Sequence, residues 1–188
     1  MKKKILVFTG SRADYSLLSP LISKIKSIRK YKLIIVAGGN HFSKIYGNTF
    51  TEILKDKIKI DFFYKFNPLS TKNDEIINYI GSSIIKFFNF VNKKKPNIAI
   101  ILGDRYEAFS FSLACFFSGI KIAHLHGGEV TTGAYDDSLR HSITKFSDLH
   151  FVCHNNYKKR VIQLGENPNK IFNVGSLGVE SIFEKKTI

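Results

Sequence analysis

The densest group of chemically active side chains lies between residues 124 and 141. These eighteen residues contain three histidines, three carboxylates, one arginine and three glycines. Metal binding by the histidines is one interpretation, and proton transfer by acids and imidazoles is the other. No cysteine lies nearby in the sequence and the ligand spacing is poor for a closed metal site, so we expect proton transfer and no bound metal. The candidates are His126, Glu129, Asp136 and Asp137 as catalytic groups, with Arg140 and His141 as substrate contacts.

A second candidate is the pair Asp104 and Arg105, which follows the wholly apolar run 98–102. Such a run is typical of a buried strand, and ligands of open α/β sheets bind beyond the carboxyl ends of the strands. A helix cap with a surface ion pair is the alternative interpretation. We favour a site, because the strand directs the pair toward the expected cleft.

A third candidate follows the apolar run 3–9 and consists of Gly10, Ser11 and Arg12. Glycine allows a tight turn, amides at a helix N-terminus attract anions, and Arg12 could hold a phosphate. A simple helix cap by Ser11 or Asp14 explains the same residues. The stretch lacks the G-x-G-x-x-G pattern, so we expect no dinucleotide cofactor, and no cofactor at all. His41 follows the next apolar run and is expected to be a further substrate contact.

Short β-branched runs alternate with longer amphipathic stretches, and these elements must position the candidates. Strands are predicted at 3–9, 32–37, 59–63, 98–102, 120–125, 149–153 and 171–174. Helices are predicted at 14–28, 50–56, 72–92, 106–118, 138–147 and 156–164. The alternation predicts the α/β class, with a Rossmann-like doubly wound parallel sheet covered on both faces. All the candidates then lie near one edge of that sheet.

The composition limits the classes of partner. The 188 residues are 44% hydrophobic, which is typical of a globular protein. No apolar stretch is long enough for a membrane span and the N-terminus lacks a signal sequence, so we expect a cytoplasmic protein without a membrane partner. The net charge of +14 suits an anionic partner. Because the lysines are dispersed, we expect a small anion and no nucleic acid. The two cysteines, Cys115 and Cys153, are expected to be buried small hydrophobes.

Several segments, taken in order, resemble the hydrolysing UDP-N-acetylglucosamine 2-epimerases of bacterial sialic acid synthesis. They are TGSRADY at 9–15, LGDRYE at 102–107, HLHGGE at 124–129, DDSLRHSITK at 136–145, YKKRVIQLGE at 157–166 and VGSLG at 174–178. The resemblance implies a fold like that of GT-B glycosyltransferases, with two Rossmann-like domains and the active site between them. Residues 1–175 would be the N-terminal domain, and 176–188 would begin the connection to a C-terminal nucleotide-binding domain.

The resemblance also implies a reaction. A base removes the proton at C2 of the sugar, UDP leaves from C1, and water adds to the resulting glycal to give N-acetylmannosamine. By resemblance, Asp104 and Asp136 match acidic positions implicated in these steps. Arg12 and Arg105 match residues near the diphosphate and the sugar. Some relatives have glutamate where this chain has His126, which therefore fits a hydrogen-bond donor or an acid as well as a base.

Asn40 stands where an apolar residue is common in the family, so two kinds of sugar stay open. One is UDP-N-acetylglucosamine, and the other is a UDP- or GDP-linked diacetamido sugar of legionaminic-type acids. A non-hydrolysing epimerase or a glycosyltransferase of the same fold is a further alternative, as is an inactive binding module that lacks its second domain. An exposed interdomain face would favour a homo-oligomer.

Overall fold

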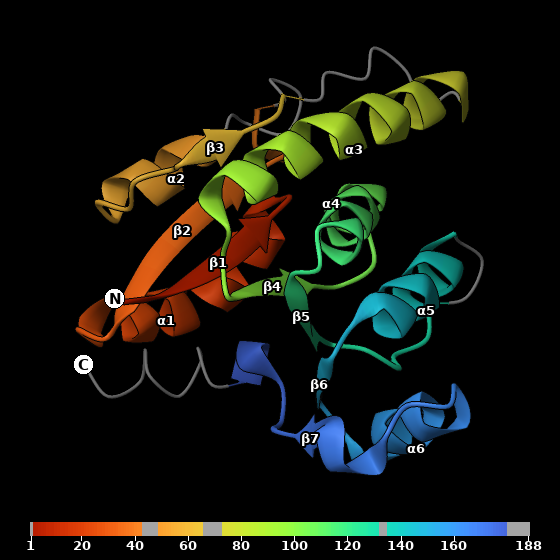
Figure 1. The fold of residues 1–188 in the computed structure, drawn as a ribbon. Helices are drawn as coiled ribbons and strands as arrows, with labels where there is room; N and C mark the ends of the chain where they lie inside the picture. Colours follow the sequence, from red (N-terminus) through yellow and green to blue (C-terminus); the bar gives the residue numbers. More distant parts are fainter. Residues whose placement is uncertain (1, 43–48, 66–72, 132–134, 180–188) are drawn as a thin grey trace.

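The computed structural model describes residues 2–42, 49–65, 73–131 and 135–179 (Figure 1). In this part of the chain seven parallel strands form one sheet, in the order β3-β2-β1-β4-β5-β6-β7. The strands are β1 Lys3–Thr9, β2 Tyr31–Ala37, β3 Phe62–Phe63, β4 Ile98–Leu102, β5 Lys121–Leu125, β6 Leu149–Val152 and β7 Ile171–Asn173. The order runs outward from β1 in both directions, which confirms the predicted doubly wound α/β fold.

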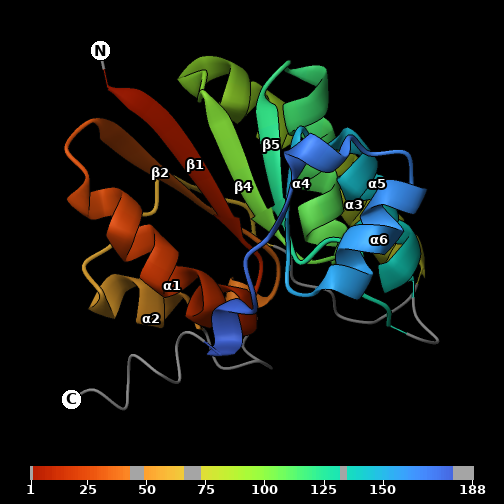
Figure 2. The ribbon, with the colours of Figure 1, turned by 90° about the horizontal axis from the view of Figure 1, so that it is seen from below.

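Helices cover both faces of the sheet, because successive side chains of each buried strand point to opposite sides. Leu6 and Phe8 of β1 pack on the side of α3 and α4, whereas Val7 packs on the side of α1. Figure 2 shows α1 on one side of the sheet and α4 and α5 on the other. The helices are α1 Arg12–Ser27, α2 Phe50–Lys55, α3 Asn73–Lys94, α4 Tyr106–Phe117, α5 Asp136–Phe146 and α6 Asn155–Gln163, with short 3-10 turns at Gly39–Phe42 and Pro168–Lys170.

Most predicted boundaries agree with the structure to within two residues, and two differences matter. The strand predicted at 59–63 is only Phe62–Phe63, because β3 is an edge strand paired solely with the end of β2. Helix α5 begins at Asp136 rather than at 138, which places two candidate carboxylates in its first turn. Residues 132–134 of the dense segment, position 72 of the predicted third helix and residues 180–188 of the predicted connection lie outside the described residues.

Gly39 shows how tightly the end of β2 packs against the neighbouring loops. Its φ of +54° is one that side chains rarely adopt, and a Cβ atom there would lie 2.7 Å from the carbonyl oxygen of Gly10 and would also collide with the Glu107 carboxylate. We expect Gly39→Ala to lower the free energy of unfolding by about 2–5 kcal/mol, from backbone strain and overpacking. Urea unfolding measures this change.

Gly81 provides the matched control for this prediction. It lies within α3, where a Cβ atom would meet nothing within 4 Å. Gly81→Ala should therefore stabilise the protein by about 0.5–1 kcal/mol. Equal effects of the two substitutions would contradict the structural argument.

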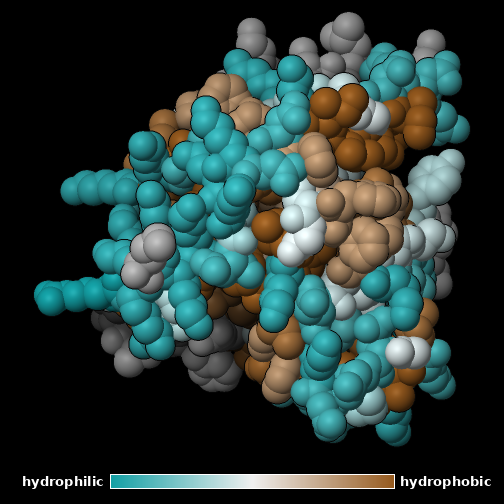
Figure 3. Space-filling view, viewed as in Figure 1, coloured by the Kyte–Doolittle hydropathy of each residue, from teal (hydrophilic) through white to brown (hydrophobic). Residues whose placement is uncertain are grey.

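Large apolar side chains remain exposed on α3 and α4. Ile77 and Ile85 project from α3, and Phe116 and Phe117 from α4, with Phe117 71% exposed. Figure 3 shows hydrophobic surface gathered over these two helices.

Among the described residues, no helix combines the length and the apolar character needed to cross a membrane.

Candidate active site

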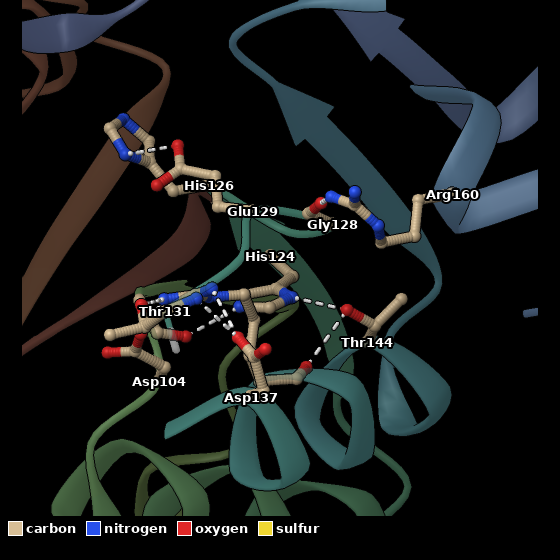
Figure 4. Close-up of polar contacts among 11 residues, drawn as sticks. Asp104, His124, His126, Gly128, Glu129, Thr131, Asp137, Thr144 and Arg160 are labelled. Carbon is tan, nitrogen blue, oxygen red and sulfur yellow. Dashed lines mark hydrogen bonds and ion pairs between the residues drawn. The ribbon is translucent and has the colours of Figure 1, made fainter. Parts of the chain in front are cut away.

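Three candidate segments meet at one edge of the sheet. Gly10 directly follows β1, Asp104 follows β4 after a single glycine, and His126 directly follows β5. Strands β1, β4 and β5 are adjacent and parallel, so their carboxyl ends lie side by side. The prediction that these residues share one edge is confirmed, and Figure 4 shows the groups around Asp104 and His126.

A buried arginine organises the first cluster. Arg140 of α5 is only 4% exposed, and its guanidinium forms an ion pair with Asp104. Nη1 also donates to Asp137 at 3.1 Å, and Nη2 to the Thr131 hydroxyl at 3.0 Å. Asp137 accepts a further bond of 2.7 Å from the backbone N–H of Thr131. A single cation thus fixes the loop after β4 against the start of α5 through charge-assisted hydrogen bonds.

Two candidates beside this cluster keep unused hydrogen-bonding capacity. Asp136, the first residue of α5, is half-buried and makes no hydrogen bond or ion pair with another described residue. His141 has a buried Nδ1 that has no partner in the described part of the chain. A buried polar atom without a partner is uncommon, so His141 is suited to contacting a ligand.

His124 has a positioning role that the sequence did not reveal. It is fully buried, with Nε2 2.8 Å from the carbonyl oxygen of Gly103 and Nδ1 3.1 Å from the Thr144 hydroxyl. A carbonyl oxygen can only accept, so Nε2 carries the proton. Burial lowers the pKa of His124 to about 4, which keeps the ring neutral. The side chain therefore connects the end of β4 to α5 and has no ring nitrogen left for a metal.

The neutral His124 should make folding sensitive to acid. Its pKa is lower in the folded chain than its ordinary value of 6.5, so it contributes stability above that value, and this stability is lost as the pH falls toward about 4. We expect the unfolding free energy of His124→Gln to fall less steeply over this interval than that of the unchanged chain. Urea titrations at a series of pH values measure both slopes.

Other buried groups also change their charge in this pH range, and they contribute equally to the curves of the unchanged chain and of His124→Gln. Burial also lowers the pKa of His41 to about 4, and it raises the pKa of Glu107 and Asp14. These three residues are present in both proteins, so the difference between the two curves reports His124 alone. Parallel curves would show that His124 does not carry the effect.

The second cluster joins His126, Glu129 and Cys153. His126 has a φ of 64°, and its Nδ1 lies 3.1 Å from a Glu129 carboxylate oxygen. Although burial alone would raise the pKa of Glu129, hydrogen bonds from His126 and Cys153 and the charge of His126 hold it below its ordinary value. Burial and the bond to Glu129 raise the pKa of Cys153 to about 12.

The structure corrects one expectation about Cys153. Although it is distant from His126 in the sequence, Cys153 directly follows β6, whose neighbour β5 ends just before His126. Cys153 is half-buried, whereas Cys115 is fully buried as expected, and both are free thiols. The available signal was the position of Cys153 at the carboxyl end of the predicted strand 149–153, because the carboxyl ends of parallel strands lie at one edge of the sheet.

Gly128 sets the position of the second cluster. Its φ is +78°, and a Cβ atom would lie 2.5 Å from the carbonyl oxygen of Tyr157 in α6. The Arg160 side chain of the same helix donates to the carbonyl oxygen of Gly128. The loop that carries Glu129 is therefore packed directly against α6.

The segment after β1 forms a conventional helix cap. The Ser11 hydroxyl accepts from the backbone N–H of Asp14 at 3.2 Å, and the Asp14 carboxylate accepts from Gly10 N–H at 3.0 Å. The amides of Gly10 and Asp14 are therefore already bonded within the protein. Arg12 is exposed and pairs with Glu52 at 3.0 Å.

Arg105 is held by a carboxylate that was not singled out from the sequence. Glu107 is fully buried, and both of its oxygens lie 3.3 Å from guanidinium nitrogens of Arg105. In the sequence, Arg105 and Glu107 resemble a surface ion pair at the start of a helix. Because Glu107 is fully buried, the pair instead fixes the position of the Arg105 side chain. A hollow of about 480 Å³ opens beside it. The hollow is lined by Ser11, Arg12, Ala13, Ser16, Asn40, Thr49 and Arg105.

The structure gives no support for ligand contact by His41. The side chain is fully buried, with Nε2 2.8 Å from the Thr9 hydroxyl and Nδ1 3.1 Å from the Thr49 hydroxyl. Both ring nitrogens are engaged by the protein. His41 therefore joins the end of β1 to the residues before α2.

Comparisons with a family model and with curated proteins agree on one protein family. The family model described as UDP-N-acetylglucosamine 2-epimerase matches residues 23–188. The chain is 43% identical to a GDP/UDP-N,N'-diacetylbacillosamine 2-epimerase (hydrolyzing) of Campylobacter jejuni, over 94% of this chain and 46% of that protein. It is 40% identical to the polysialic acid biosynthesis protein P7 of Escherichia coli, over 95% and 46%.

The fold agrees with a solved structure of UDP-GlcNAc 2-epimerase from Neisseria meningitidis bound to UDP-GlcNAc. The TM-score is 0.83 at 19% identity, and the match covers 98% of this chain and 50% of that one. The chain therefore spans about half the length of the curated relatives it matches.

Proposed function

The chain belongs to the UDP-N-acetylglucosamine 2-epimerase family, and from that premise we propose that it carries the sugar-handling residues of a hydrolysing nucleotide-sugar 2-epimerase. The observation that carries this proposal is the convergence at one sheet edge of three groups. They are the carboxylates around Arg140, the His126–Glu129 pair and an arginine-lined hollow. Residues 1–175 are proposed as one domain of a two-domain enzyme, and 176–188 as the start of the connection to the other.

The proposed reaction has two stages. A carboxylate takes the proton from C2, the C1–O bond breaks with its electron pair leaving on the nucleoside diphosphate, and a C1=C2 double bond forms. Water then adds at C1, and C2 receives a proton on the opposite face. This sequence needs an ionised base on one side of the ring and a proton donor on the other.

We assign proton removal to the carboxylates near Arg140, with Asp104 and Asp136 as the acting groups and Asp137 as their support. Asp104 is held in place by Arg140, and Asp136 is unengaged by the described residues. We assign proton delivery to His126 with its partner Glu129, because His126 Nδ1 lies 3.1 Å from a Glu129 carboxylate oxygen and an imidazole can carry a proton to a reacting atom.

Arg12 and Arg105 are proposed to attract the diphosphate. Both line the hollow beside the N-terminus of α1, where Ser11 supplies a further polar contact. Arg12 is held only by an exposed ion pair, which is weak enough to exchange for a phosphate.

The sugar is proposed to be a 2-acetamido sugar linked to UDP or GDP. UDP-N-acetylglucosamine is the first candidate, because the matching family model carries its name. A diacetamido sugar is the second, and the name of the 43% identical Campylobacter jejuni relative favours it.

The test is turnover by the protein in its full natural length, in deuterated water, with each candidate nucleotide sugar. The proposal expects free 2-epimerised sugar, one nucleoside diphosphate per sugar and one deuterium at C2. A product that keeps its nucleotide would indicate a non-hydrolysing epimerase. No turnover of any candidate would favour a binding module.

Self-association is part of the proposal. The exposed side chains of α3 and α4 form an apolar surface of the kind that often pairs in oligomers. Sedimentation of the unchanged chain and of Phe117→Ser, exposed at 71%, tests it. A monomer at all concentrations would contradict it.

A further inference from the structure

Three potential metal ligands converge beside the carboxyl end of β5. His126 and Glu129 come from the loop after β5, and Cys153 comes from the end of β6. One ligand atom from each side chain lies within 4.8 Å of the others. They are a nitrogen, an oxygen and a sulfur, the three donor types that zinc takes in proteins.

The geometry is close to what a single ion needs. Ligand atoms around a tetrahedral zinc ion are about 3–4 Å apart, given metal–ligand distances of about 2.0–2.3 Å. His126 Nδ1 and Glu129 Oε1 are already 3.1 Å apart. Small rotations of the three side chains are therefore sufficient to bring their ligand atoms to bonding distance from one ion. The left-handed backbone of His126, at a φ of 64°, holds the imidazole in this place, and such strain is often found at functional sites.

The local charge also suits a divalent cation. The chain has a net charge of +14, yet among the described residues no lysine or arginine forms an ion pair with Glu129. The carboxylates of Asp104, Asp137 and Glu107, in contrast, are paired with arginine. A glutamate anion, a cysteine thiolate and a neutral imidazole together balance two positive charges.

His126 has hydrogen-bonding capacity to spare. One ring nitrogen faces Glu129, and Nε2 is buried without a partner in the described part of the chain. His124 differs, because both of its nitrogens are bonded to the protein.

Contrary to the expectation from the sequence, we propose that His126, Glu129 and Cys153 bind one Zn²⁺ ion, with the fourth position open to water or to a ligand oxygen. Binding releases the thiol proton of Cys153 to solvent, and the thiolate sulfur, the imidazole nitrogen and the carboxylate oxygen each donate an electron pair. Because His126 and Glu129 are in the proposed catalytic set, bound zinc would withdraw both from proton transfer. That consequence rests on the proposed function, whereas the binding itself does not.

Cobalt provides the direct test, because Co²⁺ takes zinc sites and reports its ligands by colour. We expect the full 188-residue chain, kept reduced by a phosphine, to bind one Co²⁺ with a thiolate-to-cobalt charge-transfer band and the strong visible bands of a tetrahedral site. Zn²⁺ should displace it. Failure of the unchanged chain to show a stoichiometric charge-transfer band would overturn the proposal.

Two variants identify the ligand. Cys153→Ser leaves Cys115 as the remaining thiol, and it should lose the charge-transfer band and weaken zinc binding at least about a hundredfold. His154→Asn removes the adjacent histidine, while asparagine still caps α6, and it should bind as the unchanged chain does. Circular dichroism confirms that both are folded. A band that survives in Cys153→Ser, or is lost in His154→Asn, would refute the assignment. Epimerase turnover is not part of this test, so the zinc site and the proposed function fail independently.

Discussion

Replacing Asp104 by asparagine is expected to lower turnover of the full-length protein about a hundredfold or more. The amide cannot accept the C2 proton, and general acid–base groups usually contribute factors of about 10²–10⁴. Asparagine can still accept a hydrogen bond from Arg140 through its amide oxygen, so the contact between the loop after β4 and α5 survives. Substrate affinity should change much less than turnover. Asp136→Asn should behave in the same way.

Steady-state kinetics with the accepted nucleotide sugar measures both effects. Asp74→Asn is the matched control, because this carboxylate is exposed in the first turn of α3, a helix that carries none of the proposed site residues. It should have normal turnover. If Asp104→Asn and Asp136→Asn also turned over at the normal rate, the assignment of the catalytic carboxylates would be wrong.

Residues 1–188 assayed alone are expected to be almost inactive and to bind UDP no better than about millimolar, which corresponds to about 4 kcal/mol. In the proposed two-domain enzyme the diphosphate and the sugar are held between the two domains. Orientation of this kind contributes up to about 7–11 kcal/mol in favourable cases. The domain described here offers mainly Arg12 and Arg105 to the diphosphate, since both line the hollow beside the start of α1.

Calorimetry with UDP and a turnover assay on the same 188-residue sample test this expectation. The protein in its full natural length, measured in parallel, is the positive control. Micromolar binding together with rapid release of free sugar from residues 1–188 would show that this domain holds the complete site.

The sequence predicted the central elements well because strands β1, β2, β4 and β5 contain buried apolar runs. Strands β1 and β4 have the predicted bounds, and the residues that follow them lie at the predicted edge. In a parallel sheet the carboxyl ends of all strands lie at the same edge. The predicted strand ends were therefore sufficient to predict which residues lie at that edge. The order of the strands was not needed for that inference.

The sequence did not predict which side chains pair across the edge. Arg140 is 36 positions from Asp104 in the chain, and nothing in either segment indicates their ion pair. Cys153 lies beside His126 only because β6 follows β5 in the sheet. Glu107 resembled an ordinary residue of a first helical turn, but its complete burial makes it the partner that positions Arg105. These contacts depend on strand order and helix packing, which a periodic pattern does not encode.

The strand order has a consequence for synthesis on the ribosome. Strand β1 emerges first but ends between β2 and β4, so one of its edges stays unpaired while the next sixty or so residues after β2 are made. Helix α3 leads the chain back across to β4, which closes that edge. From then on β5, β6 and β7 each add beside the strand made just before. The later strands each wait for a shorter stretch of chain, so the interval before β4 emerges is the longest, and a chaperone that shields exposed strand edges would help most then.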